Sequence, residues 1–148
     1  MSETKIQTGP VDPAAQGWET LSSWGAFTEM IGPIWEHRGD SGSARTVAYG
    51  FRAEPRHMNR RDVMHGGMLM SFADSVLGNT VFGAVQAPIA TISLNSDFIG
   101  VVVAGDWVEV RPQITRQGRS LVFIRGTLTV GDKAVMTADG IWKVLGRN

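Results

Sequence analysis

The 148-residue sequence contains no cysteine. This absence excludes disulfide bonds, a thiol nucleophile and zinc sites built on thiolates. Only three histidines are present, and no two of them have H-x-x-x-H spacing. The sequence therefore predicts no metal site and no metal cofactor.

Net charge is also absent, since 14 basic residues balance 14 acidic ones. Nothing in the composition favours nonspecific binding to nucleic acid. The first residues lack the basic-then-apolar pattern of a signal peptide. Outside residues 65–85 the longest apolar run is far short of the ~20 residues that span a bilayer. We therefore expect a soluble, cytoplasmic protein that binds neither nucleic acid nor membrane.

The length suits one domain with a core of its own. We expect a flexible arm over residues 1–20, which are polar and rich in proline and glycine, and a folded domain over 21–148. Within the domain, residues 21–31 predict a short amphipathic helix that ends at Gly32-Pro33.

The next segments predict a β-hairpin, with strands at 34–38 and 43–53. Between them, Gly39-Asp40-Ser41-Gly42 is similar to the nucleophile loop of trypsin-like proteases. A chain this short cannot form the two barrels of those enzymes, so a hairpin turn is the better interpretation.

Alternating apolar and polar residues predict four later strands. They cover residues 90–99, 106–116, 119–130 and 133–145. We expect them to form an antiparallel meander that the earlier hairpin completes. The predicted fold class is α+β, with a curved antiparallel sheet wrapped around one long central helix.

That central helix is predicted over 65–85, where the chain is apolar nearly all round and therefore expected to be buried. Asp74 is the only charged residue between Asp62 and Asp97. A buried carboxylate must find hydrogen-bond donors, become neutral or be held for chemistry. The alternative is that Asp74 lies on an exposed strip of the helix and is only solvated.

Gly66 and Gly67 begin this helix, where backbone N–H groups lack partners and the helix dipole is positive. Such an end can hold an anion or polarise a carbonyl oxygen. Gly66 and Asp74 are eight residues apart, about 12 Å at ~1.5 Å per residue. One carbonyl cannot contact both, so either they are unrelated or the two groups come from two copies of the chain. We predict an active site shared between subunits.

Several polar residues near this helix have two interpretations each. His65 is a general base, an N-cap or a packing residue. Asn59 is a turn former or an amide donor aimed at the site. Arg60 and Arg61, together with Arg56, are a solvated charge run or a site for an anionic ligand.

The same choice applies farther along the chain. Arg116 and Arg119 flank Gly118 in a predicted hairpin turn, where they bind phosphate or are simply solvated. Met70, Val81 and Phe82 are candidates to line an acyl pocket, although core packing is the ordinary role of each.

The pattern Asn59-x5-His65-Gly66-Gly67-x6-Asp74 resembles the hotdog-fold acyl-CoA thioesterases, specifically the phenylacetic-acid-pathway thioesterase group. The strand at 88–98, the segment 105–108 and the hairpin at 116–123 continue the resemblance, which covers roughly residues 25–146. The resemblance implies homodimers that usually pair into homotetramers.

The resemblance also implies roles for five residues. Asp74 would be the general base or nucleophile, and the Gly66 N–H would polarise the thioester carbonyl. Asn59 would supply a supporting amide, Thr91 would help to place the attacking water, and His65 would orient the loop. Thioester hydrolysis passes through a tetrahedral oxyanion and needs no cofactor, because CoA is part of the substrate.

Two other functions remain open. A 3-hydroxyacyl thioester dehydratase uses the same fold, with a histidine and an acid facing each other across the dimer, and His65 and Asp74 could serve. A non-catalytic acyl-CoA-binding module is the second alternative.

Overall fold

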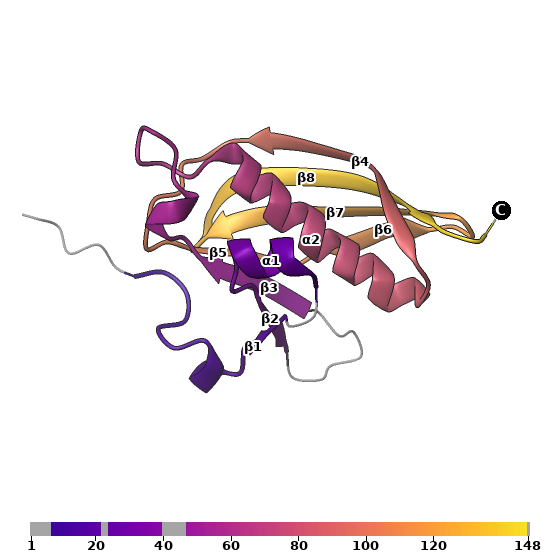
Figure 1. Cartoon of the computed structure of the whole chain (residues 1–148), viewed down its shortest axis with the longest axis horizontal. Coiled ribbons are helices and arrows are strands. Elements are labelled where there is room, and N and C mark those ends of the chain that lie inside the picture. Colours follow the sequence, from indigo (N-terminus) through magenta and orange to yellow (C-terminus); the bar gives the residue numbers. More distant parts are fainter. Residues whose placement is uncertain (1–6, 22–23, 40–46, 148) are drawn as a thin grey trace, which may run out of the picture.

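The computed structural model describes residues 7–21, 24–39 and 47–147. In these ranges the chain forms an eight-stranded antiparallel sheet with one long helix lying across it (Figure 1). The elements are η1 (Ala14–Gln16), β1 (Glu19–Thr20), α1 (Ala26–Ile31), β2 (Trp35–Arg38), β3 (Val47–Arg52), η2 (Pro55–His57), α2 (Gly66–Val85), β4 (Ile89–Phe98), β5 (Trp107–Val110), β6 (Gln113–Gln117), β7 (Leu121–Val130) and β8 (Lys133–Val144).

The strand order in the sheet is β1-β2-β3-β5-β7-β8-β4, and β6 also pairs with β7. The strand that follows α2 therefore lies at the edge, where β4 pairs with β8 from Ile89↔Val144 to Phe98↔Met136. The predicted meander is wrong in this respect, because the chain crosses from the β4 edge to β5 in the interior of the sheet. Alternation of side chains predicts a strand, but it does not determine which strand lies beside it.

The strand predicted at 106–116 is divided in two. β5 ends at Val110 and β6 begins at Gln113, with Pro112 between them. Proline has no N–H to donate to a neighbouring strand, so the ladder is interrupted there. The two parts nevertheless both pair with β7.

α2 matches the predicted central helix, and it packs against β4, β7 and β8. Its buried residues are Met68, Leu69, Phe72, Ala73, Val76, Leu77, Gly78, Val81 and Val85. The expectation of burial on all sides is wrong, since Asp74, Phe82, Gly83 and Ala84 are exposed in the single chain. The sheet curves around one side of the helix only. By length and composition α2 could cross a membrane, but half of its most apolar window is buried inside the protein.

The N-terminal segment contacts the sheet. Arg52 donates a hydrogen bond to the Thr8 carbonyl at 2.7 Å and another to the Pro10 carbonyl. The Trp18 ring packs edge-on against Trp107, 5.1 Å between centroids. Two carbonyls and one large aromatic ring of residues 7–20 therefore have partners on β3 and β5. The flexible arm over residues 1–20 was expected from composition alone and stays a prediction. The division at residue 20 stays a prediction.

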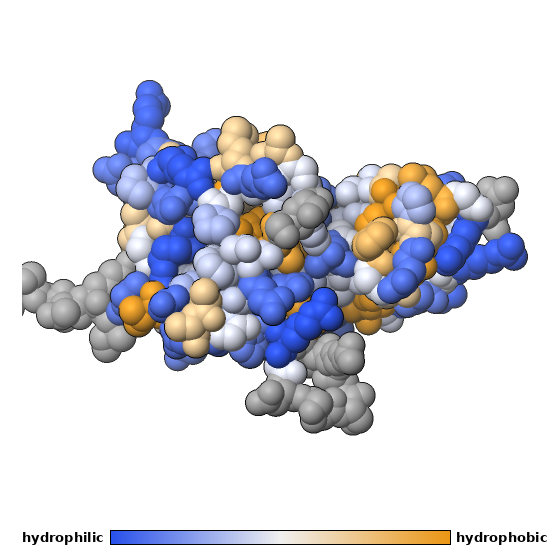
Figure 2. All heavy atoms as spheres, turned by 60° about the horizontal axis from the view of Figure 1, so that its bottom comes forward, coloured by the Kyte–Doolittle hydropathy of each residue, from blue (hydrophilic) through white to orange (hydrophobic). Residues whose placement is uncertain are grey.

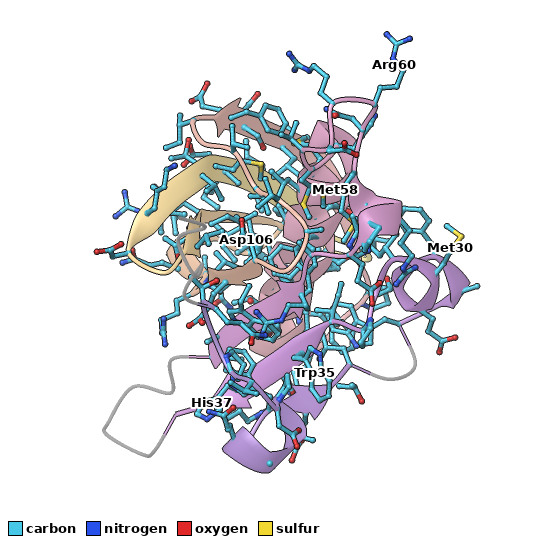
Figure 3. All side chains as sticks on the ribbon, turned by 90° about the vertical axis from the view of Figure 1, so that its left-hand side faces the viewer. Met30, Trp35, His37, Met58, Arg60 and Asp106 are labelled. Carbon is cyan, nitrogen blue, oxygen red and sulfur yellow. The ribbon has the colours of Figure 1, made fainter. Side chains whose placement is uncertain are left out.

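The early hairpin has the predicted pairing, with β2 antiparallel to β3. Figure 3 shows Trp35 and His37, both from β2, close to the N-terminal segment. The turn predicted at Gly39-Asp40-Ser41-Gly42 lies mostly outside the described residues.

Candidate active site

Asp74 and Thr91 are joined by a hydrogen bond between α2 and β4. The Thr91 hydroxyl donates to Asp74 Oδ1 at 2.8 Å. Asp74 lies on the exposed side of α2, in a hollow of about 380 Å³. The residues lining the hollow are Phe27, Thr28, Met70, Ser71, Asp74, Ser75 and Leu94. In the single chain the acid is therefore hydrogen-bonded and accessible rather than enclosed.

His65 is the N-cap of α2. Its Nδ1 accepts a hydrogen bond from the Gly67 N–H at 2.8 Å. The Gly67 N–H, which we predicted would contact substrate, is thus already paired with the cap. Within the described part of the chain, the N–H of Gly66 donates to no acceptor. Of the two glycines, Gly66 offers the free donor.

Gly66 also lies directly against Phe98 of β4. A Cβ built on Gly66 would come within 3.2 Å of the Phe98 ring. A side chain at this position would push the ring aside, so the start of α2 and the end of β4 approach closely because residue 66 is glycine.

Asn59 forms a turn in the loop before α2. Its Oδ1 accepts from the Arg61 N–H at 2.8 Å, and its own N–H donates to the Val63 carbonyl at 2.7 Å. This is the turn-forming role that its sequence context favours. Arg60 and Arg61 are exposed in this loop, and Figure 3 shows Arg60 extending outward from it.

Arg56 has a different environment from Arg60 and Arg61. It donates to the carbonyls of Met30 and Gly32 and pairs with Glu54 at 2.6 Å. These contacts hold the end of α1 and occupy the Arg56 guanidinium. Arg60 and Arg61, by contrast, form no ion pair among the described residues. A ligand role for Arg60 and Arg61 stays a prediction.

His57 is buried in this region, and the sequence analysis did not identify it as a structural residue. Its Nδ1 accepts from the Glu54 N–H at 3.1 Å, and its Nε2 lies 2.8 Å from the Ile31 carbonyl, to which it donates. Burial lowers the pKa of His57 and the charge of Arg56 lowers it further, against opposing effects of the Ile31 carbonyl and Glu54. The ring is therefore neutral, and it ties α1 to the loop that leads into α2.

Arg116, Gly118 and Arg119 belong to the β6–β7 hairpin. The Gly118 N–H donates to the Leu121 carbonyl at 2.8 Å, which closes the turn, and both arginines are exposed. The adjoining Ser120 carbonyl accepts from the Val144 N–H at the end of β8. Leu145 in turn bonds to Pro88, just after α2, so this hairpin lies at the end of α2 opposite Gly66.

The three apolar candidates have separate positions. Val81 is fully buried in the core, which is the ordinary role weighed for it, and its place in an acyl pocket stays a prediction. Met70 lines the hollow that contains Asp74. Phe82 is 52% exposed and lines a second hollow farther along α2. Among the described residues, no three His, Cys, Asp or Glu side chains are close enough together to hold a metal ion.

Residues 62–137, slightly more than half of the chain, match the family model of the Thioesterase superfamily. The chain belongs to this superfamily. It is 27% identical over 129 residues to the Pseudomonas aeruginosa protein PA0474, a provisionally assigned esterase, with 86% of this chain and 94% of that protein covered.

Solved structures share the fold. The Escherichia coli PaaI protein from the phenylacetic acid degradation operon superposes with a TM-score of 0.72 at 20% identity, covering 84% of this chain and 88% of that chain. A hypothetical thioesterase of Streptococcus pneumoniae, solved with coenzyme A, gives a TM-score of 0.64 at 17% identity, covering 69% and 80%. The predicted hotdog fold is confirmed, and family membership supports thioester hydrolysis in general.

Proposed function

We propose that the protein hydrolyses acyl-CoA thioesters to a free acid and CoA, in a site shared between two copies of the chain. The observation that supports this most directly is the Asp74–Thr91 hydrogen bond on the exposed side of α2. It holds a carboxylate where a substrate can reach it. The donor predicted to polarise the carbonyl, the Gly66 N–H, is at the start of the same helix.

The bonding of Asp74 suits a general base. Thr91 occupies Oδ1, and within the described residues Oδ2 has no partner and can accept a proton from water. The Thr91 oxygen keeps lone pairs that can accept a hydrogen bond from the same water. The water oxygen then bonds to the thioester carbon while its proton passes to Asp74. Collapse of the oxyanion breaks the C–S bond, and the departing thiolate takes up that proton. Asp74 attacking the carbon itself is the second possibility within the same proposal.

The carbonyl oxygen would gain negative charge beside the Gly66 N–H. A helix N-terminus stabilises such a charge, and removal of one oxyanion donor typically costs about 10²- to 10³-fold in rate. Because Gly66 and Asp74 are about 12 Å apart along α2, the donor and the acid of one site come from different copies.

The second copy would bind at β4. Beyond β8 this strand has no other neighbour among the described strands, so one edge of backbone N–H and C=O groups is unpaired. Ile92, Phe98, Ile99 and Val101 are each more than half exposed along or just after it. A two-fold axis at this edge would cover them and bring each Asp74 toward the other chain. Further pairing of the dimers would give a homotetramer.

CoA is the thiol that we propose as leaving group. The bound coenzyme A in the Streptococcus pneumoniae protein of the same fold supports it. The phosphates would bind exposed arginines, either Arg60 and Arg61 or Arg116 and Arg119, since guanidinium groups bind phosphate in bidentate fashion. The two arginine pairs lie at opposite ends of α2 in one chain. In a two-fold dimer, one arginine pair of each chain would therefore lie near the active site that contains the partner's residues.

The N-cap hydrogen bond of His65 limits its use as a catalytic base in the alternative dehydratase function. Because Nδ1 already accepts from Gly67, only Nε2 could exchange a proton with substrate. Hydrolysis does not require His65 to transfer a proton at all.

The test is release of free thiol from acyl-CoAs, followed with a thiol-reactive dye. Asp74→Asn keeps the shape of the side chain but removes its basicity, so we expect at least a thousandfold loss of turnover with fold and oligomeric state unchanged. Asp74→Ala, measured beside it, reports whether the empty space admits a water that partly replaces the base. Full turnover in Asp74→Asn, or an absorbance change of an enoyl-CoA without thiol release, would overturn the proposal.

A further inference from the structure

A second hollow, of about 350 Å³, adjoins the one that contains Asp74. It is lined by Trp24, Ser75, Gly78, Asn79, Phe82 and Ile89. The four α2 residues in it are spaced i, i+3, i+4 and i+7, so they form one stripe along the helix. Ser75 lines both hollows and follows Asp74 in the chain. An acyl group whose carbonyl carbon is at Asp74 can thus continue directly into this space.

The walls of this hollow are mostly apolar and carry no charged side chain. Trp24, Phe82 and Ile89 provide the surface, and no Asp, Glu, Lys or Arg lines it. Figure 2 shows apolar side chains gathered toward the end of the molecule at which α2 ends. Phe82 and Leu145 are both exposed in the single chain. Such a surface favours a hydrocarbon over a charged group.

Gly78 lets α2 approach Trp142 of β8 beside the hollow. A Cβ on Gly78 would lie 3.3 Å from the indole nitrogen of Trp142, so the helix backbone approaches that ring as closely as packing allows. Any larger residue at 78 would project against this ring.

Trp24 and Asn79 form one wall of the hollow. Both also line a neighbouring hollow of about 340 Å³ whose other residues include Glu19, Glu36 and Arg38. Asn79 is held in place because its Nδ2 donates to the Tyr49 hydroxyl at 2.8 Å. Removal of the Trp24 ring would therefore open this hollow toward the neighbouring one.

We infer that the hollow bounded by Trp24 and Phe82 is the acyl subsite, and that Trp24 sets the longest acyl group accepted. The inference rests on the proposed hydrolysis of acyl-CoAs. At ~30 Å³ for each non-hydrogen atom, the share of a water molecule in the liquid, the space holds roughly ten such atoms. The substrate class is therefore an uncharged, apolar acyl group of up to roughly ten carbons, with no carboxylate at its far end.

The experiment measures kcat/KM for straight-chain acyl-CoAs from two to sixteen carbons. Burial of one methylene contributes ~0.8 kcal/mol, so we expect kcat/KM to rise about fourfold per added carbon until the hollow is full, and then to fall. Trp24→Ala joins the two hollows and should raise activity on the fourteen-carbon substrate at least tenfold relative to butyryl-CoA. Phe82→Trp fills the hollow and should shift the optimum to shorter chains.

Ratios between long and short substrates within each variant remove differences in the amount of folded protein. A wild-type protein that hydrolyses no acyl-CoA would contradict the proposed function itself. Hydrolysis by the wild type with a chain-length profile that neither variant moves would contradict only the acyl subsite. If Trp24→Ala does not fold, Phe82→Trp decides alone, because adding a larger ring at a half-exposed helix position leaves the core intact.

Discussion

Thr91 on β4 donates a hydrogen bond to Asp74 on α2, 2.8 Å between Oγ1 and Oδ1. The bond engages one carboxylate oxygen and leaves the other without a partner among the described residues. It also ties the exposed side of α2 to the edge strand, where the second copy is proposed to pair. The orientation of the acid and the pairing edge are thus linked by one side-chain contact.

Replacement of Thr91 tests this link. Thr91→Val keeps the shape but removes the hydroxyl, so Asp74 loses its donor and the attacking water loses a neighbour. We expect kcat to fall about 10- to 100-fold while KM changes little, because the interaction acts on the nucleophile rather than on the acyl-CoA. Thr91→Ser retains the hydroxyl and should keep kcat within a few fold. Equal losses in the two variants would show that only the size of the side chain matters.

Gly66→Pro removes the proposed oxyanion donor without removing the helix. Residue 66 is the first of α2, where proline is tolerated, and His65 has φ −63° and ψ 130°, which suits a residue before proline. We expect thiol release to fall about 10²- to 10³-fold. Gly66→Ala is the matched control, because it makes the same approach to Phe98 but keeps the N–H. If Gly66→Ala loses as much activity as Gly66→Pro, the contact with Phe98 and not the N–H is responsible.

Mixing the inactive Asp74→Asn and Gly66→Pro chains tests whether the site is shared. Random association makes about half of the dimers mixed, and each mixed dimer has one site with an intact Asp74 and an intact Gly66. We expect recovery of about a quarter of wild-type activity after co-refolding in equal amounts. A site contained within one chain would recover nothing, which would exclude the shared arrangement.

The sequence predicted those parts of the fold that depend on the order of apolar and polar residues within one segment. It did not predict the parts that depend on which segments lie side by side in space. The limits of α2 follow from a glycine pair and a run of apolar residues, both visible in the sequence. The edge position of β4 was missed, because strand order depends on which chain segments meet in space. Exposure of Asp74 was left open for the same reason: an apolar helix is expected to be buried on all sides, although here the sheet covers only one side of it.

His65 provides a test that separates capping from proton transfer. Its Nδ1 satisfies the Gly67 N–H at the start of α2. Loss of an N-cap costs about 1 kcal/mol, so His65→Ala should lower the unfolding temperature by about 2–4 °C. His65→Asn supplies an equivalent acceptor and should keep both stability and thiol release near wild type. A complete loss of activity in His65→Asn with normal stability would instead assign the imidazole a role in chemistry, as in a dehydratase.

The neutral, buried His57 predicts how stability depends on pH. Because burial lowers its pKa in the folded protein, the unfolded chain binds a proton at a higher pH than the folded chain does. Between those two pKa values the unfolded state holds more protons than the folded state. The stability that His57 contributes is therefore fully present above about pH 6.5 and is lost as the pH drops below it. One proton can contribute at most about 1.4 kcal/mol per pH unit. His57→Gln can still donate to the Ile31 carbonyl but does not titrate. Urea unfolding at pH 7.5 and pH 5 should therefore show a smaller loss in His57→Gln than in the wild type. If the wild type and His57→Gln lose the same stability between pH 7.5 and pH 5, protonation of other groups weakens the fold in acid, and protonation of His57 does not.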